Sequence, residues 1–340
     1  MLTAPYGSWS SPITAGRVAT AGLRLGGLSA SGASLYWLEG RPAEGGRSVL
    51  MRGAADRIEQ LTARDVSVRT RVHEYGGGAY LVRGERVIFV NFADQRLYLQ
   101  APGREPRPIT PEAAQPGDRV PSAALRYADL VLDEPRRRLI CVREDHRRPE
   151  IDPMGVNEIV AVPLPGDPDS GDAGAGAGAS RRGPEDPGAA GHPGEVLVSG
   201  HDFFAHPRLS PDGARLLWLA WDHPKMPWDG TQLFAAGFAP DGTLLEPELV
   251  AGGPGESIFQ PEWSPDGEIH FVSDRSGWWN LYRSRNGRSE PLCPMEAEFG
   301  LPMWSLDPTT YAFESARSLV CVYNQHGISH LARLDLESLR

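Results

Sequence analysis

The stretch PEWSPDGEIHFVSDRSGWWNLYR, residues 261–283, decides the fold. Its SPDG sequence at 264–267 predicts a turn, because Pro presets φ, Asp bonds to the backbone ahead of it and Gly tolerates positive φ. The β-branched and aromatic run at 269–272 predicts a strand, and Asn286-Gly287 further on predicts a tight hairpin. The region is therefore expected to form an antiparallel meander of about four strands.

The same pattern recurs along the chain. A second SPDG turn occurs at 210–213, and other copies carry different turn residues between similar apolar runs. Six units are recognisable, around 28–38, 79–99, 127–142, 207–221, 261–283 and 303–323. Repeats of about 40–50 residues with four short strands are typical of propeller blades. The sequence predicts an all-β chain, a β-propeller of four-stranded antiparallel blades, with six blades recognisable and a seventh incomplete or missing.

The expected propeller spans residues 19–340 and follows an N-terminal segment, residues 1–18. One stretch interrupts it: residues 165–194 are rich in Gly, Ala and Pro and have almost no large apolar side chains. Such a stretch does not bury enough surface to offset its ordering entropy. We therefore predict a disordered insertion within blade three. Its GAGAGAS run lacks the GxGxxG spacing of a nucleotide-binding loop.

Composition excludes several classes of function. The net charge is −10 without a basic block, which argues against nucleic acid as a partner. No window is apolar enough to span a membrane, and the N-terminus lacks the pattern of a secretory signal. The three cysteines (Cys141, Cys293 and Cys321) form no CxxC or Cys/His cluster and are interpreted as buried apolar residues. A soluble, cytoplasmic protein is expected.

The motifs of common enzyme classes are missing. No serine has Gly at both −2 and +2, as the GxSxG nucleophile turn requires. His73-Glu74 is followed by Tyr75-Gly76-Gly77 and so does not form HExxH. No metal-ligand spacing and no Walker loop occur. The sequence therefore predicts no catalytic residue, no metal and no cofactor in this chain.

Three polar and aromatic clusters remain as candidates for a substrate-facing surface or a domain interface. The first precedes three glycines, which could serve only close backbone approach near the axis. The second lies in a long loop, a common place for function, which could instead be packing. In the third, Asp274 and Arg275 could brace a turn while the Trp rings pack between blades. The candidates are His73, Glu74, Tyr75, Asp222, His223, Trp228, Asp229, Arg275, Trp278 and Trp279.

These segments carry a family resemblance. SPDG…FVSDRSG..NLY resembles the repeat of Tol-type propellers and of prolyl oligopeptidase family serine peptidases. APYGSWSSPITA, SVRTRVHEYGGGAY, WDHPKMPWDGTQLF and SDRSGWWNLYR, in that order, are similar to the dipeptidyl aminopeptidase/acylaminoacyl-peptidase-like branch. The resemblance covers most of residues 4–335, apart from the insertion.

The resemblance implies a propeller that caps the active site of a C-terminal α/β-hydrolase domain and restricts access to small peptides. That domain, normally in the same chain, is absent from these 340 residues, so no catalytic residue is carried over and the chain alone is expected to be inactive. Peptide substrates would be bound through that domain. The resemblance also implies that residues 1–18 pack on it.

Two other hypotheses stay open at this stage. The chain could be a stand-alone propeller that serves as a binding or scaffold module. It could also be a propeller enzyme that uses His73, Glu74, Asp222 and His223, although the sequence does not show that these residues converge.

Overall fold

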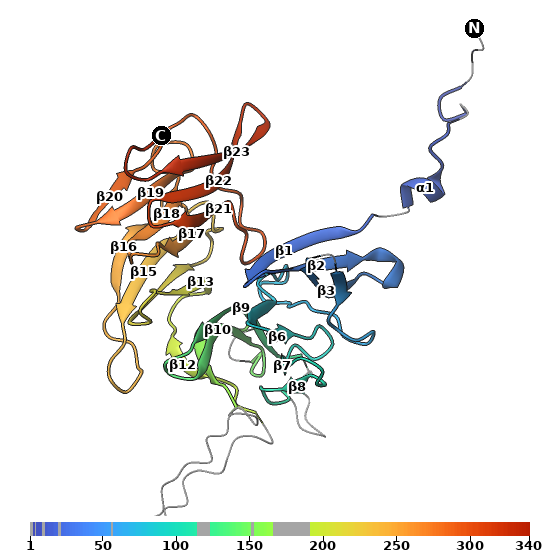
Figure 1. Cartoon of the computed structure of the whole chain (residues 1–340), viewed down its shortest axis with the longest axis horizontal. Helices are drawn as coiled ribbons and strands as arrows, with labels where there is room; N and C mark the ends of the chain where they lie inside the picture. Colours follow the sequence, from blue (N-terminus) through green and yellow to red (C-terminus); the bar gives the residue numbers. More distant parts are fainter. Residues whose placement is uncertain are drawn as a thin grey trace, which may run out of the picture. The chain divides into compact units, whose positions relative to one another are not determined.

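The computed structural model is built almost entirely of β-strands (Figure 1). It describes residues 3, 5–8, 11–19, 22–55, 57–113, 123–150, 153–165 and 191–340. The described part contains one α-helix, α1 (Ala15–Ala19), and a single-turn 3-10 helix (Pro42–Glu44). Most of the predicted disordered insertion lies outside the described residues, between the third and fourth strands of one sheet.

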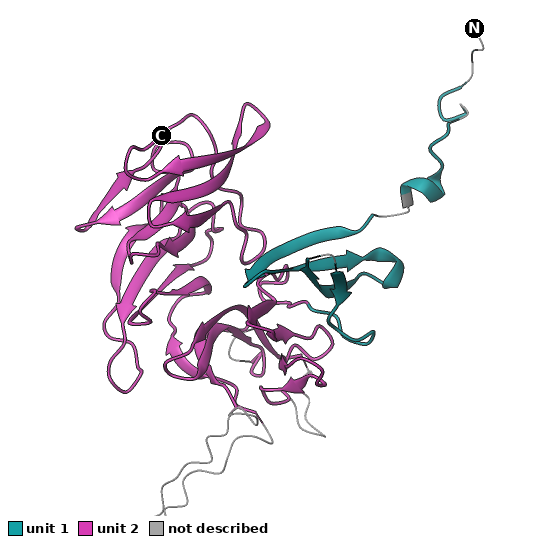
Figure 2. Cartoon of the chain, viewed as in Figure 1, with its two compact units in different colours: residues 1–68 teal, residues 69–340 magenta. Residues whose placement is uncertain are grey.

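The chain divides into two compact units (Figure 2). The first, Met1–Val68, holds one antiparallel sheet in the order β1-β2-β3-β4. Its strands are β1 (Arg24–Ser31), β2 (Ser34–Arg41), β3 (Arg47–Ala54) and β4 (Arg57–Gln60).

The second unit, Arg69–Arg340, holds five further antiparallel sheets. Four of them have four strands and the last has three in the described residues. The first two sheets comprise β5 (Tyr80–Arg83), β6 (Arg86–Val90), β7 (Leu97–Gln100) and β8 (Arg107–Pro108), then β9 (Leu125–Asp133), β10 (Arg138–Asp145), β11 (Val156–Pro163) and β12 (Glu195–Val198).

The remaining three sheets follow in chain order. They comprise β13 (Phe203–Leu209), β14 (Arg215–Trp221), β15 (Gln232–Gly237) and β16 (Glu248–Gly252); β17 (Ile258–Trp263), β18 (Ile269–Ser273), β19 (Asn280–Arg285) and β20 (Arg288–Pro291); and β21 (Tyr311–Ser315), β22 (Ser318–Gln325) and β23 (Ile328–Asp335). The predicted six-bladed β-propeller is confirmed. The sixth sheet differs from the prediction because it has three strands in the described residues rather than four.

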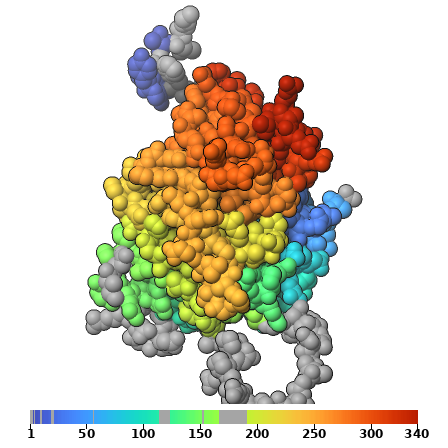
Figure 3. Space-filling model, turned by 90° about the vertical axis from the view of Figure 1, so that its left-hand side faces the viewer, coloured from blue at the N-terminus to red at the C-terminus, as the bar shows by residue number. Residues whose placement is uncertain are grey.

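The central blades of the second unit, such as those of β9–β12 and β13–β16, bury both faces of their inner strands, whereas β23 in the last sheet is mostly exposed. In β14 every residue after Arg215 is buried. A strand with only one buried face would instead alternate between buried and exposed residues. One apolar core runs from Val72 and Ala128 to Leu336, and another joins the sheet of β5–β8 to that of β9–β12. Cys141 and Cys321 are buried and unpaired, as predicted, whereas Cys293 is unpaired but only partly buried. Figure 3 shows the sheets from residue 200 onward as a continuous packed surface.

The two SPDG turns have the geometry expected from their sequence. Gly267 has φ +87° and its N–H donates to the Ser264 carbonyl at 2.9 Å. The Ser264 hydroxyl donates to the Asp266 carboxylate at 2.6 Å and accepts from the Glu268 N–H at 2.9 Å. Asn286 and Gly287 both have positive φ and form a two-residue hairpin between β19 and β20. The polar groups of these turns are therefore hydrogen-bonded within the turn itself.

The first strand of three successive blades contains a β-bulge. In β9, β13 and β17 the pairing register shifts next to a residue of positive φ, respectively Asp129 (+55°), His206 (+51°) and Gln260 (+43°). All three side chains are at most 1% exposed. A bulge re-aims a side chain out of the regular alternation. Here the bulges bring polar groups from successive blades together.

An ion-pair network links these bulges. The Arg208 guanidinium contacts the carboxylates of Asp129 at 2.9 Å, Glu262 at 3.1 Å and Asp307 at 2.7 Å. Burial raises the pKa of Asp307 against the opposing effect of Arg208. The His206 N–H donates to Asp129 at 2.7 Å. Residues from four successive blades are thereby joined.

Candidate functional site: an aromatic cavity on one face

The order of strands places several loops at the same end of the second unit. In an up-and-down sheet, the segment that enters the first strand and the loop that joins the second and third strands lie at one end, whereas the first-to-second turns lie at the other. The SPDG turns are therefore at the opposite end from the segments entering β5 and β21 and from the β10–β11 and β14–β15 loops. All three predicted clusters belong to this common face.

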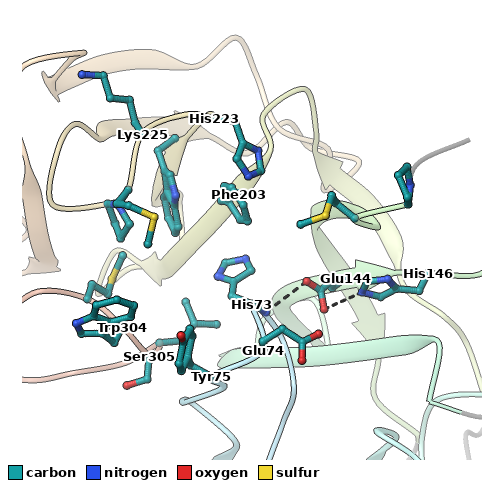
Figure 4. Close-up of a pocket in the computed structure, with 17 residues that line it drawn as sticks. His73, Glu74, Tyr75, Glu144, His146, Phe203, His223, Lys225, Trp304 and Ser305 are labelled. Carbon is teal, nitrogen blue, oxygen red and sulfur yellow. Dashed lines mark hydrogen bonds and ion pairs between the residues drawn. The ribbon is translucent and has the colours of Figure 1, made fainter. Parts of the chain in front are cut away.

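Four of these segments and the strand β13 enclose a cavity of about 440 Å³ (Figure 4). This volume lies in the range of small-molecule sites. The lining is mainly apolar and comes from residues far apart in the sequence. It consists of His73, Glu74, Tyr75, Glu144, His146, Pro153, Met154, Phe203, Trp221, His223, Lys225, Met226, Pro227, Met303, Trp304, Ser305 and Leu306.

Aromatic rings form two walls of the cavity. Phe203 and Trp221 are stacked with their centroids 5.3 Å apart, and the edge of the His73 ring lies against both. Tyr75 and Trp304 meet edge to face at 5.4 Å. These last two side chains are 61% and 53% exposed, which is unusual for rings of this size. The walls offer faces and edges against which another ring can pack.

The carboxylates of the cavity are already paired with arginine. The Arg126 guanidinium lies 2.8 Å from both Glu74 and Glu144. Its hydrogen bond to Glu74 lowers the pKa of that carboxyl. Glu144 also accepts the backbone N–H of His73 at 3.3 Å, and it lies 3.0 Å from the His146 ring (Figure 4). Both carboxylates therefore have cationic partners within the protein.

The surroundings of the His73 imidazole favour its neutral form. Burial against the aromatic rings is the main cause, and it lowers the pKa despite the nearby Glu144. His73 and Glu74 also have positive φ, 52° and 64°, a conformation that is uncommon outside glycine. The ring is thus held as part of the wall rather than as a charged group.

The long loop after β14 is held by its own aspartates. Asp222 accepts the Asp202 N–H at 2.8 Å and contacts the His201 ring at 2.8 Å. Burial raises the pKa of Asp222, but these bonds outweigh it and keep the pKa below its usual value. Asp229 accepts the Met226 N–H at 3.0 Å, while the His223 ring contacts Asp202 at 3.1 Å.

The three glycines after Tyr75 form a close backbone contact. Gly76 accepts the Leu306 N–H at 2.7 Å, and Gly77 forms a parallel bridge with Leu306. A Cβ on Gly77 would lie 1.9 Å from the Leu306 carbonyl oxygen, and one on Gly78 would lie 2.8 Å from the Asp129 backbone. We call residues 76–78 and Leu306 the glycine clasp. The expectation of close backbone approach is met here.

The predicted site residues fall into three groups. His73, Glu74, Tyr75 and His223 line the cavity. Trp228 lies behind the lining, with its ring 4.6 Å from that of Trp304, and Asp222 and Asp229 hold the loop. Arg275, Trp278 and Trp279 are not among the lining residues.

The third cluster has structural contacts instead. The Arg275 guanidinium pairs with Glu256 at 2.7 Å and lies over the Tyr282 ring. Asp274 accepts the Ser257 N–H at 2.7 Å, so the two residues brace the turn through separate partners rather than through each other. Trp279 packs against Phe259, and Trp278 is 40% exposed.

Most of the charged and aromatic residues of the lining were not among the residues predicted from the sequence. Glu144, His146, Phe203 and Trp304 lie in segments with no motif of their own. Trp221 and Lys225 belong to the WDHPKMPWDG segment but were not among the candidates. The strand order predicts some of these neighbours, because it puts the β10–β11 loop, the β14–β15 loop and the segment before β21 at the same end of their sheets.

The described residues show no group of three or more His, Cys, Asp or Glu side chains arranged to hold a metal ion. Within that same part of the chain, no helix is long and apolar enough to cross a membrane.

Comparisons with known proteins agree with this architecture. No family model matches the chain, and no curated protein matches it. Among solved structures, puromycin hydrolase is 36% identical over all of this chain, with a TM-score of 0.83. A puromycin-hydrolyzing peptidase of Mycobacterium tuberculosis is 37% identical over 100% of this chain, with a TM-score of 0.81. Prolyl oligopeptidase B of Galerina marginata, at 10% identity and a TM-score of 0.56, shares the fold.

The chain spans about half the length of the puromycin-hydrolysing relatives, 49% in each case. The similarity covers the entire β-propeller described above, including the segments that enclose the cavity. With this coverage and identity, the chain belongs to the prolyl oligopeptidase family as a β-propeller domain.

Proposed function

We propose that this chain is the non-catalytic propeller part of a prolyl-oligopeptidase-like serine peptidase. Its partner is an α/β-hydrolase domain, and the propeller caps the active site and restricts access to small peptides. The observation that carries the proposal is the 36–37% identity, over 99–100% of this chain, to enzymes that are about twice as long and hydrolyse puromycin.

The cavity supports this role. Its volume of about 440 Å³ suits a small ligand rather than a folded protein, and its loops occupy one face of the second unit. Among the described residues, the paired carboxylates and His73 form no nucleophile–base pair with a serine, which supports a chain that supplies walls rather than the reacting group. The three free cysteines support a reducing, cytoplasmic location.

The first test uses this chain alone. Residues 1–340 should not hydrolyse peptides and should not be labelled by a fluorophosphonate, because the reagent requires an activated serine. Stoichiometric labelling, located by mass spectrometry on a serine of this chain, would overturn the proposal.

The second test uses the gene product with its hydrolase domain. A series of substrates from dipeptides to a folded protein should show kcat/KM falling steeply with length, because only small peptides pass the propeller. Puromycin is included as a small substrate. Equal cleavage of short peptides and of an unfolded protein would contradict the gating role, while a gene product without any hydrolase domain would favour the stand-alone binding module.

A further inference from the structure

The chain contains one lysine among its 34 basic residues, and that lysine lies at the cavity. Lys225 sits in the loop after β14, within the sequence HPKMPWDG, and its side chain is exposed at the rim. In Figure 4 its ammonium extends away from His73. A four-carbon stem with free rotation brings such a group over the mouth of a cavity at little cost.

Within the described part of the chain, Lys225 is also the charged group at this cavity without an ion-pair partner. No carboxylate of the described residues forms an ion pair with its ammonium, whereas Glu74 and Glu144 are paired with Arg126. Burial favours the neutral form of His73. Glu74 is also paired with Arg71 at 3.6 Å, so the exposed Lys225 ammonium is the cation at the mouth that can meet an anionic group on a ligand.

The walls define the other part of the ligand. Trp304 and Tyr75 present half-exposed rings on one side, and the stacked pair of Phe203 and Trp221 lies on another. Met226, next to the lysine, is 40% exposed and adds a flexible apolar surface. An aromatic group fits this lining better than an aliphatic chain does, because edge-to-face contacts add to burial.

We propose that the cavity is a subsite for a short peptide with an aromatic residue at its free carboxyl end. The ring packs against Trp304 and Tyr75, and the carboxylate is bound by Lys225. This inference rests on the proposed function only for the source of the ligand, since short peptides are the substrates and products of such a peptidase. The binding itself belongs to residues 69–340 and needs no catalytic step.

The test is calorimetric titration of the chain with three probes. Gly-Phe carries the ring and the carboxylate, Gly-Phe amide lacks the carboxylate charge, and Gly-Ala lacks the ring. Gly-Phe should bind about fivefold more tightly than each of the other two, as expected for one partly exposed charge contact or one ring contact. Equal affinities, or inorganic phosphate binding as tightly as Gly-Phe, would overturn the proposal.

Variants separate the two contacts. Lys225→Gln should weaken Gly-Phe about fivefold and leave Gly-Phe amide unchanged, and Lys225→Arg should restore most of the loss. Trp304→Ala should lower the affinity for both Gly-Phe and Gly-Phe amide. Trp278 is an exposed tryptophan outside the cavity, so Trp278→Ala should change neither affinity. A Lys225→Gln variant with full affinity for Gly-Phe would contradict the role of the lysine.

The single lysine allows a second readout that needs no variant. An acetylating reagent has only Lys225 and the terminal amine as amine targets, and mass spectrometry separates them. Gly-Phe should slow acetylation of Lys225 and not that of the terminus, and Gly-Phe amide should not protect. Unprotected Lys225 in saturating Gly-Phe would overturn the assignment.

The outcomes also distinguish this inference from the proposed function. A chain that binds Gly-Phe as expected, in an enzyme that cleaves long and short substrates equally, would refute gating and keep the subsite. Steep length dependence without any selectivity for the carboxylate would keep gating and refute the subsite.

Discussion

The turns at one end of the blade sheets follow a repeated sequence, whereas the loops at the other end do not. At one end the SPDG turns repeat at 210–213 and 264–267, and each satisfies its own polar groups through the same serine and aspartate contacts. At the other end the segments before β5 and β21 and the β10–β11 and β14–β15 loops have no shared motif, and their side chains enclose the cavity. Repetition marks the parts that build the fold, and irregularity marks the parts that can bind. Four predictions test this difference.

The largest effect is expected at the glycine clasp. Gly77→Ala places a Cβ 1.9 Å from the Leu306 carbonyl oxygen at φ +105°, so the backbone must shift. Overpacking and the left-handed conformation together should lower the free energy of unfolding by about 3–5 kcal/mol and weaken binding at the cavity. Gly277→Ala is the matched control, because it has φ +85° but open space, and it should cost only about 1 kcal/mol. Similar losses in urea denaturation would show that the close approach is unimportant.

The second effect is a pH dependence at His206. Burial lowers the pKa of His206 from 6.5 to about 4, with Asp129 opposing and Arg208 adding to the shift. Between these values the unfolded state binds the proton and the folded state does not, so stability is present above pH 6.5 and is lost as the pH falls towards 4. The upper limit of this loss is about 3 kcal/mol.

His206→Asn should remove this acid sensitivity, because Asn tolerates positive φ and does not titrate. Urea denaturation at a series of pH values measures it. His326→Asn, at an exposed turn with the same φ of 51°, is the matched control and should leave the slope unchanged. A wild-type and a His206→Asn slope that coincide would refute the assignment.

The third effect concerns the repeated turn. Ser264 is fully buried, and Ser264→Ala removes both its bond to Asp266 and the acceptor for the Glu268 N–H. Stability should fall by about 1–2 kcal/mol, and Ser210→Ala should show a similar loss in its copy of the turn. Neither variant should change ligand affinity at the opposite end. A changed affinity for Gly-Phe, measured by calorimetry, would show that the turns at one end influence binding at the other end.

The smallest effect is expected for Trp278→Ala. This side chain is 40% exposed and lies outside the cavity lining. Stability should change by less than about 0.5 kcal/mol. A large decrease in the unfolding temperature of this variant would show that the Trp278 ring makes a stabilising contact, contrary to the expectation.

The sequence predicts the repeated parts well, because their determinants are local. Proline, aspartate and glycine at fixed positions specify the SPDG turn, and Asn286-Gly287 specifies its hairpin. Each unit therefore carries its own signature, and the sequence predicts all six sheets.

The cavity could be predicted only in part, since its members meet through tertiary contacts. His73 and Trp304 are brought to one cavity by the strand order and by the clasp, neither of which leaves a local pattern. Arg275 was singled out because it stands in a conspicuous motif, yet its partner is Glu256 in the preceding turn. Polar and aromatic residues in a turn motif more often brace the turn.

The glycine clasp has a consequence for when the cavity forms during folding. Gly77 and Leu306 are separated by most of the second unit, so their contact closes the longest loop in that unit and forms only when the blade of β21–β23 is in place. Because hairpin contacts are local and this contact is not, we expect the blades to form before the binding face is complete. We therefore expect the cavity to form late in folding and to open early when the chain is partly unfolded.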